Sequence, residues 1–376
     1  MSSKEWKTYK LRDLTTKIGS GATPRGGKDA YLESGDYSLI RSQNVLDFTF
    51  SYNGLAFINK AQATQLNNVT VAERDVLLNI TGDSVARVCQ VPNEVLPARV
   101  NQHVAIIRPD NSKLLPEFLK YYLLNPSCKN QLLSFSAVGA TRNALTKGMI
   151  EDIDIQLPII KEQQRIASIL SSLDDKIELN RQTNQTLEGI AQTLFQEMCV
   201  PRGEELPEGW RVGKLEEVLE IKYGKDHKHL ENGLIPVYGS GGIMRYANKA
   251  LYEHESILIP RKGTLSNLFY INKPFWSVDT MFYTKIKNKT YGKFLFLLLK
   301  TMNLATMNVG SAVPSLTTQV LNNIEIILPS DATIEKFDDI VTPMFTTIES
   351  NEQETQTLIA LRDSLLPKLM KGEIEI

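Results

Sequence analysis

The chain has 376 residues, of which 42% are hydrophobic, and its formal net charge is −1. This length provides for two or three domains with hydrophobic cores. No stretch approaches the roughly 18 uninterrupted apolar residues of a membrane span, and the polar first residues lack the apolar core of a signal peptide. We therefore expect a soluble protein of the cytoplasm with no membrane partner.

The first 157 residues predict a mixed α/β domain. Short β-branched or apolar runs alternate with turn-rich segments that contain glycine, proline and serine. Residues Leu115–Leu124 predict a helix with a proline in its first turn. The runs that predict strands are Tyr37–Ile40, Asp75–Ile80 and His103–Ile107.

A long helix is predicted next, over residues 158–200. Apolar residues recur there at spacings of three and four, which is the pattern of a coiled-coil seam. Two seam positions, Asn180 and Asn184, are polar. Such residues can fix the register of a helix pair or can lie at its surface, and the sequence leaves both possibilities open. The seam positions expected to pair with another helix are Leu173, Ile177, Asn180, Leu187 and Leu194.

After this helix the chain turns and begins a second domain. A linker rich in proline and glycine, Pro201–Trp210, leads into a shorter α/β domain, and the two together occupy residues 201–328. The counterpart of the first domain's helix is predicted at Tyr291–Leu299. A second long helix is predicted over 329–376, with seam positions Met344, Ile348, Asn351, Leu358 and Leu365.

The second half of the chain repeats the first. Residues from about Val138 to Met198 return at about Val309 to Leu369 with an offset of 171. The repeat includes the motifs Val-Gly, Leu-Thr and Ile-x-Ile-x-Leu-Pro, which chance similarity of two amphipathic helices would not supply. We therefore expect an α+β fold with pseudo-two-fold symmetry. The two mixed α/β domains would be separated by two long helices, packed as an antiparallel coiled coil.

Charge is distributed unevenly along the chain. The segments 158–200 and 329–376 hold 8 basic and 16 acidic residues, which leaves 34 basic and 27 acidic residues for the domains. A basic excess in the domains favours a polyanionic partner such as DNA, although a solvated surface alone can also produce it.

Loop residues beside glycines and turns are the candidates for DNA contact. Lys and Arg bind phosphates, Asn and Gln pair with adenine, and Arg pairs with guanine. Any single one of them is more commonly an ordinary solvated residue, so the prediction concerns the set. The candidate phosphate contacts are Arg25, Lys28, Arg41, Arg87 and Arg142 in the first domain and Lys225, Lys228, Arg245, Arg261 and Lys262 in the second. The candidate base readers are Gln43, Asn44, Arg142, Asn143 and Asn267.

The sequence offers no catalytic or metal-binding arrangement. The Asn/Asp-Pro-Pro-Tyr/Phe loop of an amino-methyltransferase does not occur. The segment Gly21–Lys28 imitates a phosphate-binding loop, but its first glycine is one position early and Asp29 replaces the Ser/Thr that would hold magnesium. The cluster Gly239–Gly242 is too short for a dinucleotide motif, so we expect turns at both places. His227 and His229 lack further ligands, and the cysteines are scattered and expected to be buried or inert thiols: Cys89, Cys128 and Cys199.

Several short motifs stand in a fixed order along the chain. The most specific is Pro158–Ala167, which carries Glu-Gln-x-Arg-Ile-Ala; the second helix departs from it at Ile334–Phe337. The others are Val100–Val104, Val138–Arg142, Leu157-Pro158, Leu173-Asp174, Lys176-Ile177, Leu194-Phe195 and Leu328-Pro329. This order, which covers nearly the whole chain, resembles the specificity subunit of type I restriction-modification systems.

The resemblance implies a non-catalytic subunit with two target-recognition domains, each binding one half of a split site in double-stranded DNA. It implies two methyltransferase (modification) subunits as partners, which methylate adenine N6 with S-adenosylmethionine. Restriction subunits, which translocate and cleave DNA with ATP and Mg²⁺, are expected to join them. No cofactor is expected on this chain itself.

A second hypothesis remains open. The acidic helices and the near-neutral total charge also suit a coiled-coil protein–protein adaptor that does not bind DNA. Retention on a DNA or heparin column at low salt separates the two hypotheses.

Overall fold

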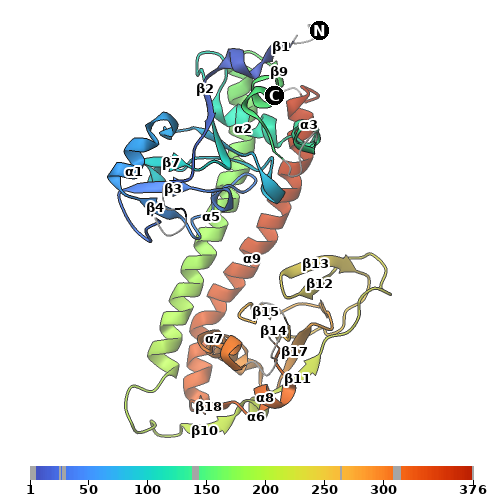
Figure 1. Cartoon of the computed structure of the whole chain (residues 1–376). Helices are drawn as coiled ribbons and strands as arrows, with labels where there is room; N and C mark the ends of the chain where they lie inside the picture. The colour runs from blue at the N-terminus through green and yellow to red at the C-terminus, as the bar shows by residue number, and fades with distance from the viewer. Residues whose placement is uncertain are drawn as a thin grey trace. The chain divides into compact units, whose positions relative to one another are not determined.

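The computed structural model describes residues 6–24, 27, 31–137, 144–262, 265–307 and 315–374. The chain forms two compact units (Figure 1). The first unit combines residues 1–179 with residues 354–376, and the second unit covers residues 180–353. Each unit therefore holds one β-rich domain and parts of both long helices.

The first unit contains two sheets and a separate strand pair. The larger sheet is antiparallel and has the spatial order β2 (Thr15–Ser20), β8 (Val104–Pro109), β5 (Val76–Asn79), β6 (Val88–Gln90). The smaller sheet, in which β3 and β7 are parallel, has the order β4 (Ala56–Ile58), β3 (Tyr37–Ile40), β7 (Ala98–Val100). The strand pair is antiparallel and consists of β1 (Lys7–Lys10) and β9 (Asp154–Leu157).

In the described part of the first unit, four short helices accompany these strands. They are α1 (Lys60–Gln65), α2 (Pro116–Leu124), α3 (Pro126–Ala137) and α4 (Lys147–Glu151). The helix predicted at Leu115–Leu124 is confirmed as α2, and Pro116 occupies its first position, where the missing N–H of proline costs no helical hydrogen bond. Helix α4 begins after Thr146, whose hydroxyl accepts a hydrogen bond from the backbone N–H of Met149.

The second unit repeats this topology strand for strand. Its larger sheet has the order β11 (Leu219–Tyr223), β17 (Met281–Ile286), β14 (Ser256–Pro260), β15 (Phe269–Ile271). Its smaller sheet, in which β12 and β16 are parallel, has the order β13 (Gly242–Ala247), β12 (Ile235–Gly239), β16 (Trp276–Ser277). The strand pair consists of β10 (Arg211–Lys214) and β18 (Glu325–Leu328). Its short helices are α6 (Leu215–Val218), α7 (Gly292–Thr301) and α8 (Thr318–Asn322).

The repeat extends to individual caps. Helix α8 begins after Thr317, whose hydroxyl accepts a hydrogen bond from the N–H of Val320, as Thr146 does for α4. The residues before these caps, Leu145 and Leu316, are both buried. The predicted internal repeat is therefore present in the topology as well as in the sequence.

Two long helices of 40 residues each complete the chain, α5 (Ile160–Cys199) and α9 (Asp331–Met370). They pack on each other within each unit (Figure 1). In the first unit, Arg362 on α9 donates a hydrogen bond to Asp174 on α5 at 2.9 Å. In the second unit, Asn351 on α9 donates to Asn184 on α5 at 2.8 Å. Later positions on α5 thus meet earlier positions on α9, and the pair is antiparallel as predicted.

Two of the polar seam positions lie inside this helix pair. Asn180 is buried, and its amide nitrogen is 3.4 Å from the carbonyl oxygen of Asn351; that of Asn184 is 3.3 Å from the carbonyl oxygen of Ile348. These amides contact the opposite helix, which favours the register role over the surface role. Among the other predicted seam positions, Ile177 and Ile348 are buried. The half-buried ones are Leu173, Leu187, Leu194, Met344, Asn351, Leu358 and Leu365.

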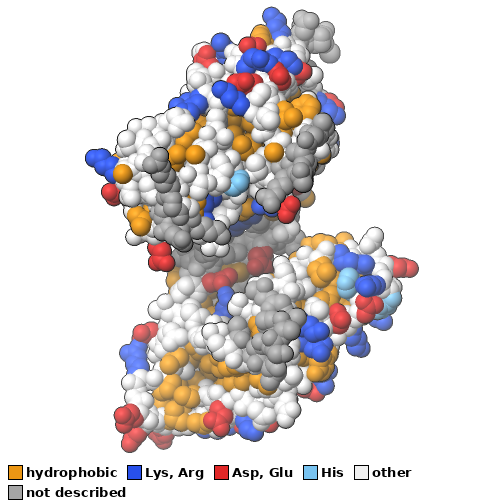
Figure 2. All heavy atoms as spheres, viewed as in Figure 1, with side chains coloured by type: hydrophobic (Ala, Val, Ile, Leu, Met, Phe, Trp, Pro, Cys, Tyr) orange, Lys and Arg blue, Asp and Glu red, His pale blue; other side chains and the backbone are white. Residues whose placement is uncertain are grey.

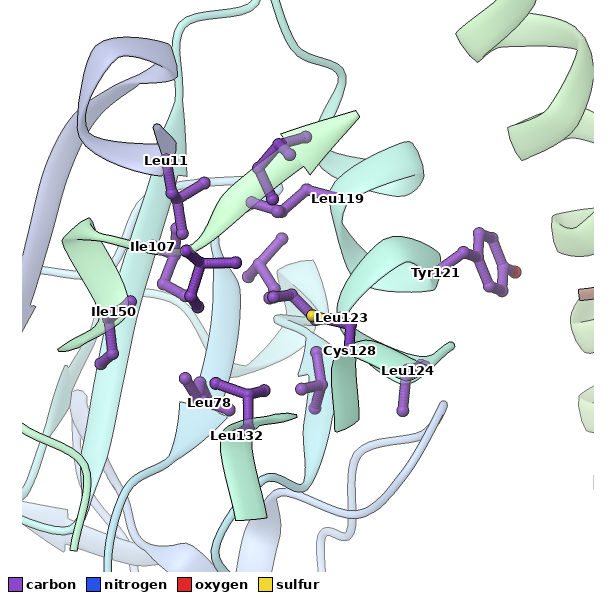
Figure 3. Close-up of a cluster of buried hydrophobic side chains, with 14 of the residues drawn as sticks. Leu11, Leu78, Ile107, Leu119, Tyr121, Leu123, Leu124, Cys128, Leu132 and Ile150 are labelled. Carbon is purple, nitrogen blue, oxygen red and sulfur yellow. The ribbon is translucent and has the colours of Figure 1, made fainter. Parts of the chain in front are cut away.

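Both long helices contribute buried side chains to each domain core. Besides the residues given below, α5 adds Ile166 and Leu170 to the first core, and α9 adds Ile334, Phe337, Val341 and Phe345 to the second. In the first unit, the larger sheet and α2 bury a cluster that includes Leu11, Leu78 and Ile107 (Figure 3), and α9 adds three side chains to it. In the second unit, α5 adds three buried side chains to the core formed by the larger sheet and α7. The added residues are Leu366, Leu369 and Met370 in the first unit and Ala191, Phe195 and Cys199 in the second.

Candidate nucleic-acid interface

In each unit, two strands of the larger sheet end at the same sheet edge. In the second unit, β11 ends at Tyr223 opposite Phe282, and β14 ends at Pro260 opposite Met281. Both lie beside β17, so the loops that follow β11 and β14 leave the sheet together. The first unit has the same arrangement at the ends of β2 and β5, on either side of β8.

A glycine follows the first of these strands in both units. A Cβ atom on Gly21 would lie 1.7 Å from the carbonyl oxygen of Val100, and one on Gly224 would lie 2.0 Å from that of Val278. The backbone N–H of Gly21 donates to the carbonyl of Asn101 at 3.1 Å. Only glycine permits this close crossing of two backbone segments, which fixes the direction in which each loop leaves the sheet. Gly21 belongs to a cluster that the sequence predicted as a turn, whereas Gly224 was not singled out from the sequence.

Four basic residues gather on the loops at this edge of the second unit. Lys225 and Lys228 follow β11, and Arg261 and Lys262 follow β14. The three lysines are exposed, and Arg261 is half-buried with its guanidinium 5.2 Å from the ring centre of Tyr223. Toward the residues that the structure describes, none of the four side chains forms a hydrogen bond or ion pair, so their charge is available to a ligand. Figure 2 shows Lys, Arg and His side chains, with Asp and Glu among them, at the right-hand edge of the view, where Figure 1 draws the loops around β12 and β13.

Two other predicted DNA contacts of the second unit are occupied by the protein itself. Arg245 donates to the carbonyl of Leu230 at 2.7 Å, and Asn267 donates to the carbonyl of Ser240 at 2.6 Å. Both side chains hold loops in place with the groups that would have contacted DNA. In the structure, Arg245 and Asn267 organise these loops, and their contact with DNA stays a prediction.

The first unit arranges Arg41 and Gln43 around one carbonyl group. Both side chains donate to the carbonyl oxygen of Gly54, and the guanidinium of Arg41 lies 5.2 Å from the ring centre of Tyr31. Gly54 has a φ of +62°, and a Cβ there would lie 2.4 Å from the amide nitrogen of Gln43. Gln43 remains exposed. This carbonyl therefore holds an arginine and a glutamine side by side.

Asn44 does not belong to this surface. Its side chain is fully buried, its amide oxygen accepts from the N–H of Arg41 at 3.0 Å, and its amide nitrogen donates to the carbonyl of Ser51 at 2.9 Å. Both polar ends of the amide are used to shape the loop, and its role as a base reader stays a prediction. Arg87 is half-buried in the loop after β5. Four candidates lie outside the described residues: Arg25, Lys28, Arg142 and Asn143.

Sequence reasoning missed a polar group at the equivalent edge of the first unit. The hydroxyl of Thr81 lies 2.6 Å from Nδ1 of His103, and the amide nitrogen of Gln102 lies 2.9 Å from its Nε2. The ring thereby links the loop after β5 to the segment that enters β8. Only the pairing of the two strands brings these residues together, so no local sequence signal could have identified the group.

Among the described residues we find no reactive cysteine and no group of metal ligands. Burial raises the pKa of Cys89, Cys128 and Cys199 to about 12, which keeps these thiols protonated. Within the ranges that the structure describes, no three His, Cys, Asp or Glu residues are grouped as metal ligands would be. Likewise, no described helix is both long and apolar enough to cross a membrane.

Comparison with known proteins identifies the family. The model of the type I restriction modification DNA specificity domain matches residues 3–189 and 207–360. The specificity subunit of type I restriction enzyme MjaIX from Methanocaldococcus jannaschii is 25% identical over 99% of this chain and 94% of its own length. That of HindI from Haemophilus influenzae is 23% identical over 98% of this chain and 100% of its own length. A crystal structure of a type I S subunit from M. genitalium superposes with a TM-score of 0.65, at 18% identity, over 98% of this chain and 97% of that one.

A fold with two DNA specificity domains and two long helices is that of a specificity protein. The chain belongs to the specificity subunits of type I restriction-modification systems. These subunits are the non-catalytic members of their complexes, in agreement with the expectation drawn from the sequence.

Proposed function

We propose that each domain of this specificity subunit binds one half of a split site in double-stranded DNA. The observation that carries the proposal is the repeated sheet edge. In both units a glycine-fixed loop and a second loop leave neighbouring strand ends, and in the second unit these loops present four basic side chains without a partner among the described residues. A cluster of free Lys and Arg on loops is suited to phosphates and base edges.

The same proposal assigns the chemistry to partner subunits. Two methyltransferase subunits would assemble on this chain and methylate adenine N6 with S-adenosylmethionine, and restriction subunits would translocate and cleave DNA with ATP and Mg²⁺. This chain would bind none of these cofactors. Its place of work would be the cytoplasm, where the DNA of a bacterial or archaeal cell is accessible.

Charge reversal tests the second domain's part in this function. We expect Arg261→Glu with Lys262→Glu to weaken binding to duplex DNA of every sequence, because both side chains lie on the proposed surface. The matched control reverses two exposed lysines of the same unit, Lys289→Glu with Lys336→Glu; Lys289 follows β17 at the opposite sheet edge and Lys336 lies on α9.

The measurement is the affinity for labelled duplex DNA as a function of salt, for the full chain alone and with its methyltransferase partner. The wild type and the control should bind at low salt and be released as salt rises, and the Arg261/Lys262 variant should bind least. If the wild type is not retained on DNA at low salt, the adaptor hypothesis replaces this one. If both double variants behave alike, the surface has been placed wrongly.

A further inference from the structure

One arginine on the proposed DNA surface is far more constrained than its basic neighbours. We propose that Arg261, held in position by Tyr223, reads a guanine in the half-site that the second domain binds. This inference rests on the proposed function and assigns a base to a single side chain. Sequence reasoning treated Arg261 as a phosphate contact and did not single out Tyr223.

The backbone of Arg261 is fixed on both sides. Its N–H donates to the carbonyl of Thr280 at 2.9 Å, and its carbonyl accepts from the N–H of Leu316 at 3.0 Å. It directly follows Pro260, the last residue of β14. The side chain therefore starts from a rigid position at the sheet edge, whereas a loop residue without such bonds would not.

Tyr223 forms a half-exposed platform beside it. Its ring meets that of Phe282 edge-on, with 5.1 Å between centres and 64° between planes, and Phe282 is fully buried. Tyr223 is 49% exposed, and the guanidinium of Arg261 lies 5.2 Å from the centre of its ring. A cation held over an aromatic face loses orientational freedom before any ligand arrives.

The contact with Tyr223 leaves the hydrogen-bonding groups of Arg261 unused. Among the described residues, no carboxylate and no carbonyl accepts a hydrogen bond from its guanidinium. A planar guanidinium in a set orientation can donate two hydrogen bonds to O6 and N7 of guanine, which is the most common specific contact between proteins and the major groove. The neighbouring lysines are exposed point charges on flexible stems, and these suit phosphates.

The first domain provides an internal contrast. Arg41 lies at the same 5.2 Å from the ring of Tyr31, but its Nη2 donates to the carbonyl of Gly54. One side of that guanidinium is thus spent on the protein. Of these two arginines, Arg261 has the aromatic support without a hydrogen bond from its guanidinium to the described residues, so both of its donor edges suit bidentate recognition.

The test is a selection of bound sequences from a random duplex DNA library by the full chain, with its methyltransferase partner where that is needed for binding. The wild type should enrich a split motif with a guanine in one half. Arg261→Lys should lose the preference for that guanine by roughly tenfold or more, because lysine cannot donate the paired hydrogen bonds, while the other half keeps its sequence.

The variants of Tyr223 separate positioning from general stability. Tyr223→Ala should weaken the preference for the same guanine. Tyr223→Phe should retain this preference, since the aromatic face alone supports the cation. Lys262→Gln is the matched control: it should lower affinity for all sequences and reduce the slope of log K against log salt by about 1, without altering any base preference.

The outcomes are distinct. A wild-type chain that enriches no sequence overturns the proposed function and this inference with it. A wild type that enriches a split motif, combined with an Arg261→Lys variant that keeps every base preference, overturns this inference alone. Loss of preference in both Tyr223 variants would show that the hydroxyl matters and would contradict the role of the ring as a support for Arg261.

Discussion

Equivalent positions at the junctions between domain and long helices are charged in the first unit and apolar in the second, where Lys293 of α7 keeps a separate ion pair with Asp338 of α9 at 2.9 Å. Helices α2 and α7 align so that Phe118 and Phe294 are both fully buried. Two positions further along, Lys120 of α2 takes the place of Phe296 of α7. With the repeat offset of 171, Asp174 of α5 corresponds to Phe345 of α9, and Arg362 of α9 corresponds to Ala191 of α5.

In the first unit these positions form a charged set. Lys120 lies 3.3 Å and Arg362 lies 2.9 Å from the carboxylate of Asp174, and the hydroxyl of Tyr121 donates to the same carboxylate at 2.6 Å. Figure 3 shows Tyr121 leaving α2 on the side opposite Leu119. Both basic side chains are 7% exposed overall. Arg362 also pairs with the exposed Asp363 at 2.9 Å, so Asp174 is the carboxylate that the two nearly buried cations share.

In the second unit the equivalent positions form an apolar set. The rings of Phe296 and Phe345 meet edge-on with 6.0 Å between centres, and Ala191 is fully buried in the same core. The difference shows that the two repeats share topology and burial, whereas the side chains at the three equivalent junction positions differ together. A mixed set would leave a charge buried without its partner, which is costly. Each half of the helix pair is thereby matched to its own domain.

Removing the central carboxylate should break the charged junction. We expect Asp174→Asn to lower the free energy of unfolding by about 3 kcal/mol, because Lys120 stays nearly buried without an anion and Arg362 keeps only the exposed Asp363. The exposed neighbour Asp175→Asn is the matched control and should change it by less than about 0.5 kcal/mol. Urea denaturation of both variants checks this, and equal stabilities would show that the buried cluster contributes nothing.

The apolar junction should fail through loss of packing. Phe345→Ala leaves a cavity between Phe296 and Tyr270, whose rings both contact Phe345, and should cost about 3 kcal/mol. The exposed neighbour Thr346→Ala serves as the control. This loss should be the same at low and high salt, whereas a strong salt dependence would contradict an apolar origin.

Transplanting the apolar set should restore the first junction. The triple variant Lys120→Phe, Asp174→Phe and Arg362→Ala removes the charges together, so we expect a net loss of only about 1–2 kcal/mol, mainly from the hydroxyl of Tyr121. Asp174→Phe alone should be far less stable than the triple variant. If the three single losses simply add, the residues do not act as a set.

The rate at which a reagent labels the buried cysteines measures the opening of each core separately, and it needs no substitution of the cysteines. Cys128 lies in the first core and Cys199 in the second, and burial raises the pKa of both thiols to about 12. Labelling by a thiol reagent should be slow in the native protein and should follow local opening. Asp174→Asn should speed labelling of Cys128 only, and Phe345→Ala that of Cys199 only, as read by peptide mass spectrometry. Equal acceleration at both sites would mean that the two cores open together.

The sequence predicts the elements and their repetition well because these depend on local patterns. Period, caps and the offset of 171 locate the long helices and pair Thr146 with Thr317. The order of strands depends on contacts between distant segments, so the sheets, and the addition of Leu366 to a core that contains Leu11, could not be read from it.

The DNA surface is only partly predictable for the same reason. Residue type suggested Asn44, Arg245 and Asn267, but their hydrogen bonds within the loops decide their role, and those bonds exist only after folding. Tyr223 was overlooked because it meets Arg261 only when β11 and β14 come together beside β17.

The most direct test of the central claim is a genome-wide map of N6-methyladenine in the source cell, with the gene intact and with it deleted. The account predicts that deletion abolishes methylation at one split motif and leaves all other motifs unchanged. An intact map with no motif that depends on the gene, in a cell that expresses the chain together with its methyltransferase, would contradict it.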